Sequence, residues 1–411
     1  MNARLKPSFL SRYPELGTEP LPVYPYLASD YYQKEIASIF RQDWLCVGRI
    51  EEIPKPGDYK VKRLDFAHTS VILIRGKDGA IGAFHNVCRH RGNKVVTETG
   101  REETYGSNKA AVITCRFHGW TYDAKGALVG VPQEERFPPC FKRADNSLVP
   151  IHVDTWSGFI CINLAEKPRM QLSEFLGGLK DHLDGYPFGS MPDVHTYYAH
   201  LNCNWKIGMD AFGEAYHVPT IHAGSFPGLT DYWQDDVAFY GDHRSIAFFA
   251  ADMNPPTPVG SAANSIFGAS IALARTEPFP LPKTVNPTRH KNWGFEQSTM
   301  FPNFLIHVGE GLWFTHQFWP ISENKCLWEG KYFLKAPKTN SEHWAQRYAV
   351  TLQRNAWLED TATMEDTHDA LMSGAVKQIN LQDDEIMLRH AFNAINRRVR
   401  ALDEEAKGAH A

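Results

Sequence analysis

The sequence lacks long apolar runs and an excess of basic residues. Its longest apolar segments, such as FGASIALA at 267–274, are far shorter than the ~18 residues that a membrane span requires. The 43 basic residues are outnumbered by 47 acidic residues, which gives a formal charge of −4. No basic cluster marks a phosphate backbone or a membrane surface. We therefore expect no membrane association and no nucleic-acid partner.

Cysteine is also scarce. The chain of 411 residues holds seven cysteines, an odd and scattered set that does not suggest a disulfide framework. The opening MNARLKPSFLSRYPELG has no continuous apolar stretch of the kind found in a secretory signal. These features predict a cytoplasmic protein in a reducing environment. In that environment Cys88 and Cys115 would be available as thiolates.

Length and composition predict two or three ordinary globular domains. Residues 30–43 have helical spacing of apolar residues, and 44–160 read as strands separated by turns. A helix is expected near 206–218, long loops at 250–292, a mostly helical stretch at 342–385 and an amphipathic helix from 385. The pattern indicates an all-β module followed by an α+β domain.

The first chemical motif is Cys88-x-His90 followed by Cys115-x-x-His118. Each pair can lie at the tip of a β-hairpin, so that two tips hold one metal centre. Zinc accepts two cysteines and two histidines, but its usual order is two cysteines and then two histidines. In a Rieske [2Fe–2S] cluster, two thiolates bind one iron and two imidazoles bind the other.

The flanking residues favour the cluster. CRHRG and CRFHGWTYDAKGAL resemble the two cluster-binding loops of Rieske proteins. Trp120 and Tyr122 in the second loop are expected to pack behind the cluster. The polar segment TETGREETYGSNKA at 97–110 lengthens the gap between the loops, and it is expected to form an extra surface excursion.

The second motif lies in NWKIGMDAFGEAYHVPTIH at 204–222. Asp210, Glu214 and His217 are spaced by four and three residues, which places them on one face of the expected helix. His222 follows His217 by five residues, so the two can face one metal only if the helix distorts or ends, and Pro219 supplies a reason. Two histidines and a carboxylate form the facial triad that holds Fe(II).

The spacing of His217 and His222 is similar to the catalytic motif of the Rieske non-haem iron oxygenases. The resemblance implies that both histidines are iron ligands. It also implies that Asp360, in the late acidic segment LEDTATMEDTHDAL, is the third ligand. Asp366 and Asp369 are nearby alternatives.

The same resemblance gives Glu214 the role of a bridge for electrons. It would bond His217 in its own subunit and His118 of a neighbouring subunit. Asp210 is either a further group near the iron or a surface carboxylate.

Taken over the chain, the pattern resembles the catalytic α subunit of the aromatic-ring-hydroxylating dioxygenase type. The implied fold class is α+β. A helical segment at 1–43 packs on the catalytic domain, 44–160 form an all-β Rieske domain, and 161–411 form a helix-grip (START-like) catalytic domain with a large antiparallel sheet.

The implied cofactors are a [2Fe–2S] cluster and Fe(II). A ferredoxin or flavin reductase would supply two electrons, ultimately from NAD(P)H. The expected assembly is a homotrimer, or an α3β3 complex with a small β subunit.

The implied reaction uses O2 to cis-dihydroxylate or monohydroxylate a hydrophobic aromatic substrate. Oxidative O- or N-demethylation is the nearest alternative, and a non-catalytic Rieske electron carrier is an alternative of another class. Large apolar residues, which also suit a cage for a quaternary ammonium group, are frequent between 239 and 319: Phe239, Phe248, Phe249, Phe267, Trp293, Phe295, Phe301, Phe304, Trp313 and Phe314.

Three basic residues in the same part of the chain are candidates to pair with a substrate carboxylate. They are His243, Arg244 and Arg289. The long loops at 250–292 could form a lid over the pocket.

Overall fold

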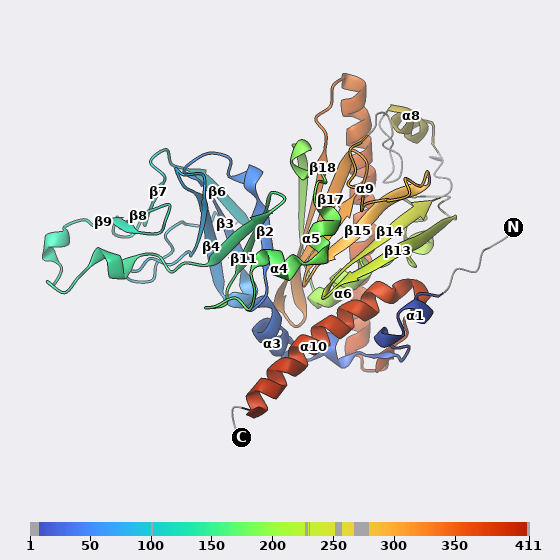
Figure 1. Cartoon of the computed structure of the whole chain (residues 1–411), viewed down its shortest axis with the longest axis horizontal. Coiled ribbons are helices and arrows are strands. Elements are labelled where there is room, and N and C mark those ends of the chain that lie inside the picture. Colours follow the sequence, from blue (N-terminus) through green and yellow to red (C-terminus); the bar gives the residue numbers. More distant parts are fainter. Residues whose placement is uncertain are drawn as a thin grey trace. The chain divides into compact units, whose positions relative to one another are not determined.

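The computed structural model describes residues 8–99, 102–226, 229, 231–250, 257–266 and 279–408. The chain divides into two compact units, one formed by 40–175 and the other by 1–39 together with 176–411 (Figure 1). The domain boundary predicted between residues 160 and 161 falls inside the strand β11 (Phe159–Asn163). The predicted residue Phe267 and much of the predicted lid lie outside the described residues.

The unit 40–175 is built from short antiparallel sheets, and its strands are rich in Val, Ile and Thr, as the sequence predicts. Their orders are β10-β11-β2, β5-β4-β3-β6 and β7-β8-β9. The bounds of the strands other than β11 are β2 Leu45–Arg49, β3 Asp58–Leu64, β4 Thr69–Arg75, β5 Ile81–His85, β6 Glu103–Ser107, β7 Val112–Thr114, β8 Thr121–Asp123, β9 Leu128–Gly130 and β10 His152–Trp156.

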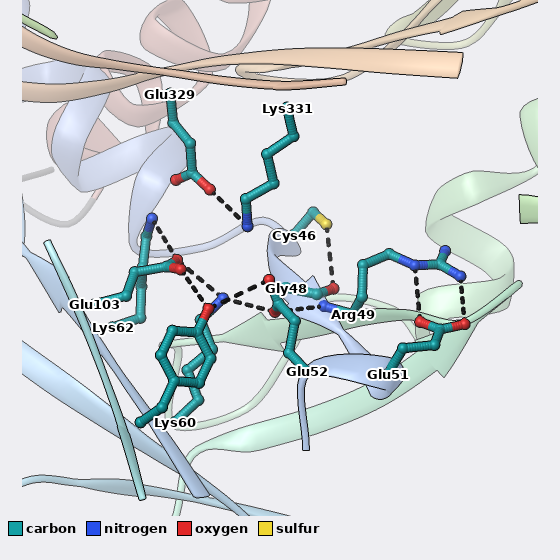
Figure 2. A network of polar contacts seen from close by, with 11 residues as sticks. Cys46, Gly48, Arg49, Glu51, Glu52, Lys60, Lys62, Glu103, Glu329 and Lys331 are labelled. Atoms are coloured by element: carbon teal, nitrogen blue, oxygen red, sulfur yellow. Dashed lines mark hydrogen bonds and ion pairs between the residues drawn. The ribbon is translucent and has the colours of Figure 1, made fainter. Parts of the chain in front are cut away.

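Strand β6 lies in the polar segment 97–110, which is therefore more than a surface excursion, because it adds a strand to the sheet beside β3. Ion pairs hold the two strands together (Figure 2). The buried Lys60 ammonium lies 2.9 Å from Glu103 Oε1 and 2.7 Å from Glu52 Oε2, and Lys62 lies 3.1 Å from the same Glu103 oxygen. Buried charges are tolerated only when they are paired in this way.

The second unit contains a seven-stranded antiparallel sheet in the described chain, with the order β12-β18-β17-β16-β15-β14-β13. This confirms the predicted α+β class with a large antiparallel sheet. The strand bounds are β12 Asp193–Leu201, β13 Tyr232–Tyr240, β14 His243–Ala250, β15 Trp293–Met300, β16 Phe304–Val308, β17 Leu312–Ser322 and β18 Lys325–Leu334. A two-stranded pair joins β1 Leu21–Pro22 to β19 Gln378–Ile379.

Most of the described helices belong to this second unit, while α4 lies at the end of the unit 40–175, and α9 is the longest described helix. Their bounds are α1 Phe9–Arg12, α2 Tyr24–Leu27, α3 Ser29–Glu35, α4 Leu172–Leu176, α5 Gly178–Leu183, α6 Trp205–Ala211, α7 Val218–Ile221, α8 Pro258–Ile266, α9 Asn340–Met372 and α10 Ile386–Gly408. A π-helical turn, Ile36–Phe40, continues α3. None of the described helices is long and apolar enough to cross a membrane.

Local sequence signals explain where α9 begins and ends. Thr339 and Glu342 form a reciprocal capping box at its start. The helix ends before Gly374, whose φ of +70° favours glycine. The predicted helical stretch to residue 385 is therefore interrupted after Met372, and α10 is a separate helix that packs against α3.

Helix α6 packs closely on β17 through Gly208. A Cβ added at this glycine would lie 2.2 Å from the ring of Phe318. We expect Gly208→Ala to lower the free energy of unfolding of this unit by about 1–3 kcal/mol, because overpacking outweighs the gain of about 1 kcal/mol in helix propensity. Denaturant unfolding checks this, and adding Phe318→Leu should recover part of the loss. Unchanged stability of Gly208→Ala would contradict the close contact.

Candidate functional site: two iron-binding constellations

The two cysteine–histidine motifs occupy loops of the same construction. One follows β5 and the other joins β7 to β8. In each loop the cysteine N–H donates to the carbonyl five residues later, and a glycine four residues later donates back to the cysteine carbonyl. These glycines, Gly92 and Gly119, have φ of +75° and +78°. Their lack of Cβ allows the left-handed turn that brings both ligands of a loop to one side.

The loops bring all four predicted ligands together. His90 Nδ1 lies 3.1 Å from His118 Nδ1, and Cys88 and Cys115 are buried. Trp120 stacks on His90 with 4.9 Å between ring centroids. The Tyr122 hydroxyl lies 3.3 Å from Cys88 Sγ. Buried sulfurs and partly exposed imidazoles fit a cluster with thiolates on the inner iron and histidines on the outer one.

The second motif is not one continuous helix, so the prediction of a helix at 206–218 is wrong in its second half. Helix α6 ends at Ala211, and the Gly213 N–H bonds to the carbonyl of Asp210 in a tight turn. The Glu214 carboxylate then accepts the backbone N–H groups of Tyr216 and His217, and the short α7 follows at Val218. Glu214 therefore lies beyond the end of α6 and does not share a helical face with Asp210.

The two histidines of this motif lie at opposite ends of α7. His217 is its N-cap residue and His222 its C-cap residue. Pro219 stands in the first turn of α7, where proline is favoured, and so it does not break a longer helix as the sequence suggested. One helical turn between the two residues is enough to turn both imidazoles toward the same point.

Asp360 on α9 completes this constellation. Its Oδ1 lies 3.3 Å from His217 Nε2 and 3.2 Å from His222 Nε2, and one atom from each residue lies within 4.8 Å of the other two. The competing acids Asp366 and Asp369 are exposed further along α9. Among the described residues, this is the group of histidine, cysteine and acidic side chains able to hold a single metal ion.

Both imidazoles are oriented by a carboxylate on their far side. His217 Nδ1 lies 2.5 Å from Glu214 Oε1, and His222 Nδ1 lies 2.9 Å from Glu359 Oε2. Each ring can therefore keep its proton on Nδ1 and present the Nε2 lone pair to a metal. Glu359 was not predicted from the sequence. Its adjacency to Asp360 was the available signal.

The charge balance of the triad also fits a cation. Burial lowers the pKa of His217, but the carboxylates of Asp360 and Glu214 outweigh burial and raise the pKa to about 10. The pKa of His222 is raised in the same way by Asp360 and Glu359 against burial. A site that favours positive charge, with two imidazoles and one carboxylate converging, matches the ligand set of Fe(II).

Asp210 does not join this group. Its Oδ2 accepts a hydrogen bond of 2.7 Å from the hydroxyl of Tyr26 on α2. The neighbouring Lys206 pairs with Glu35 on α3, at 2.7 Å, and these contacts join α6 to the N-terminal segment. Asp210 is therefore neither a surface carboxylate nor a group that contacts the triad.

Burial raises the pKa of Asp210 to about 7, against the lowering effects of Tyr26 and Arg244. The unfolded carboxyl titrates near its ordinary value of 3.8. Between these values the folded state binds more protons, so the free energy of unfolding should fall as pH rises, by on the order of 4 kcal/mol in total. We expect Asp210→Asn to lose less thermal stability than the wild type between pH ~5 and ~8. Parallel melting shifts in the two proteins would contradict this.

A cavity opens beside the triad, with about 780 Å³ of empty space, part of it open to solvent. Residues of β13 to β17 line one side, and α9 contributes the opposite side. The aromatic lining residues are Phe212, Phe226, Phe248, Phe295, Phe314 and Trp357. Three of the aromatic residues named from the sequence therefore line the cavity, Phe248, Phe295 and Phe314. Others fill the core, as Trp313 does by stacking on Phe333.

The three basic residues suggested for a substrate carboxylate do not line this cavity. The His243 ring accepts the N–H of Phe301, and Arg289 donates to backbone carbonyls of 281–286. Arg244 lies beside Asp210, and burial lowers its pKa to about 10. Polar residues that sequence reasoning missed do line the cavity, among them Gln297, His307 and His316.

The comparisons with known proteins agree with both constellations. The family model for the catalytic domain of ring-hydroxylating alpha subunits matches residues 188–401, slightly more than half of the chain. The model for the Rieske [2Fe–2S] domain matches residues 43–151. The first matched range contains the triad and the second contains all four cluster ligands.

Curated relatives of two kinds are similarly close. A chlorobenzene dioxygenase alpha subunit from Cupriavidus sp. is 34% identical over 50% of this chain and 45% of its own length. A carnitine monooxygenase oxygenase subunit from Acinetobacter baumannii is 29% identical over 54% of this chain and 56% of its own length. The matches thus span about half the length of these relatives.

Solved structures share the fold over nearly the whole chain. Naphthalene 1,2-dioxygenase from Rhodococcus sp. is 19% identical, with a TM-score of 0.71 over 97% of this chain and 98% of that one. A quaternary ammonium Rieske monooxygenase is 21% identical, with a TM-score of 0.72 over 92% of this chain and 94% of that one. The two family matches show that this chain belongs to the Rieske non-haem iron oxygenases, as an alpha subunit, and the two predicted ligand sets lie within the matched residues.

Proposed function

We propose that this protein is the terminal oxygenase component of a multicomponent system and that it hydroxylates an aromatic substrate with O2. The main support for this proposal is that the possible ligand atoms of His217, His222 and Asp360 converge at the wall of an aromatic-lined cavity. When bound there, mononuclear iron supplies the activation of O2. The triad residues would hold the metal, and the cavity would hold the substrate beside it and limit the access of water.

The cavity favours a flat, uncharged ring over a quaternary ammonium group. Its aromatic side chains offer apolar contact, and its described carboxylates are Glu214 and Asp360. Both of these carboxylates already face the triad histidines. Aromatic faces also attract a quaternary ammonium group, but the described lining offers it no further carboxylate. Oxidative demethylation is the second candidate, because a carnitine monooxygenase subunit is as similar in sequence as the aromatic dioxygenases.

The electrons would come from outside the chain. We propose that a ferredoxin or flavin reductase delivers them singly to the cluster, and that the protein works as a trimer, with or without a small β subunit. In such a trimer Glu214, which already holds His217, would also bond His118 of the neighbouring subunit. Cis-dihydroxylation and monohydroxylation both need two electrons for each O2.

A single-turnover experiment tests this function. The reduced, iron-loaded protein would be mixed with isotopically labelled O2 and a panel of aromatic hydrocarbons, aromatic acids, methyl ethers and quaternary amines, and the products analysed by mass. We expect labelled oxygen in a ring product, with two labelled atoms for a dioxygenase and one for a monooxygenase. Release of formaldehyde would favour the demethylase. A triad that binds no iron after Fe(II) addition would favour an electron carrier.

A further inference from the structure

Three polar side chains form a continuous strip on the sheet side of the active-site cavity. Gln297 on β15, His307 on β16 and His316 on β17 all line the cavity. Gln297 and His307 are direct register partners, and the His307 and His316 rings lie 5.4 Å apart. All three are more than nine-tenths buried. We refer to these residues as the polar strip.

Each member of the polar strip has a buried atom without a hydrogen-bond partner in the described chain. These atoms are Gln297 Nε2, His307 Nδ1 and His316 Nε2. An unpaired buried polar atom is costly, and such atoms are rare in folded proteins. Three of them on one wall of a cavity therefore call for a partner that enters the cavity.

The existing hydrogen bonds fix what this partner must offer. His307 Nε2 lies 3.1 Å from Gln297 Oε1, so His307 donates there and keeps Nδ1 as an acceptor. The Trp328 indole donates to His316 Nδ1 at 3.1 Å, so His316 carries its proton on Nε2. Burial lowers the pKa of His307 to about 3 and that of His316 well below its usual value, so both rings are neutral. The strip thus presents an acceptor between two donors.

Aromatic neighbours hold the strip rigidly. His307 stacks on Phe314 with 4.3 Å between centroids, and His316 stacks on Phe212 at 4.0 Å. Trp357 from α9 meets His316 edge-on at 4.8 Å. The imidazoles are therefore unable to rotate away to find other partners. A flat ring entering between α9 and the sheet would place its substituent against the strip.

We propose that the polar strip selects a neutral aromatic substrate whose substituent both donates and accepts hydrogen bonds, such as a phenolic hydroxyl or a carboxamide. This rests on the proposed function, because the strip belongs to the same cavity as the triad. The described lining contains no lysine or arginine to pair with a substrate carboxylate. A site built around hydrogen bonds also rejects an analogue that lacks them, since its own polar atoms then stay unpaired.

Calorimetric titration of the iron-loaded protein under nitrogen tests the strip without turnover. Naphthalene, a naphthol, a naphthamide, a naphthoate and a trimethylammonium naphthalene would be compared. We expect the naphthol and the naphthamide each to bind at least about tenfold more tightly than naphthalene. Equal affinity for naphthalene would mean that water satisfies the strip, and tightest binding of either charged compound would also overturn the proposal.

Substitutions test whether the preference for naphthol over naphthalene comes from the polar strip. His307→Phe keeps the stacking on Phe314, and Gln297→Leu keeps approximate volume. Each should reduce the preference for naphthol to about threefold or less, with the affinity for naphthalene unchanged. Gln353→Leu, on the α9 side of the same cavity, is the matched control and should retain the full preference. A preference that survives both strip substitutions would overturn the proposal.

The two proposals fail in different ways. Preferential binding of naphthol with no labelled product in a single turnover would leave the strip supported and the proposed function contradicted. Labelled product from naphthalene and naphthol alike, with equal affinities, would support the proposed function and overturn the strip.

Discussion

Asp360→Ala should abolish product formation while the [2Fe–2S] cluster remains in place. The Asp360 carboxylate faces the Nε2 atoms of both His217 and His222, at 3.3 and 3.2 Å, and its removal leaves two neutral ligands for a divalent ion. Loss of an outer partner of a metal ligand already costs 10–100-fold in affinity or activity. We therefore expect the loss of a direct ligand to lower iron affinity by more than about a hundredfold.

Two measurements check this prediction. Mononuclear iron would be counted after Fe(II) loading, and the cluster would be followed by its visible absorption, which should persist because its four ligands lie in the unit 40–175. Asp366→Ala is the matched control on the same helix, since Asp366 is exposed. It should bind iron and form product like the wild type. Full iron occupancy in Asp360→Ala would remove Asp360 from the ligand set.

The two cluster loops could be predicted because the residues that define each loop are close together in the sequence. Each loop carries its two predicted ligands and its left-handed glycine within five consecutive residues, so the turn that brings them together depends on neighbouring residues only. The convergence of His217, His222 and Asp360 was also expected, although Asp360 stands 138 positions after His222, because family resemblance links segments that spacing does not. These segments come together through tertiary packing, such as that of α9 against α6, which a single sequence does not display.

Other features depended on tertiary contacts. The helix predicted through Glu214 stops at Ala211, and the Glu214 carboxylate instead accepts the N–H groups of Tyr216 and His217 just before α7. Asp210 meets Tyr26, a residue 184 positions earlier in the chain. The polar strip requires that Gln297 and His307 pair across two strands, and the sequence segment MFPNFLIHVGEG gives no sign that His307 faces a cavity. Local sequence patterns thus indicated which residues could act as ligands. They did not indicate which way a side chain such as that of His307 points.

Glu214→Gln should leave both iron sites filled but slow the oxidation of the cluster by about 10–100-fold, an effect of the size seen for outer-shell metal partners. The Glu214 carboxylate holds His217 Nδ1 through Oε1, at 2.5 Å. A bridge between two imidazole N–H donors needs two acceptor oxygens, and glutamine supplies one. The amide can still hold His217, so iron binding should survive while the proposed link to His118 of a neighbouring subunit is lost.

Glu359→Gln is the matched control, because Glu359 holds His222 Nδ1 at 2.9 Å just as Glu214 holds His217. Both substitutions remove one negative charge beside a triad histidine, so a general effect of charge would slow both variants alike. The measurement is stopped-flow reoxidation of the reduced cluster by O2 and substrate, with the iron content of each variant determined first. Only the Glu214 variant should be slow. Rapid reoxidation in Glu214→Gln, or equal slowing in both variants, would show that Glu214 orients His217 without carrying electrons between subunits.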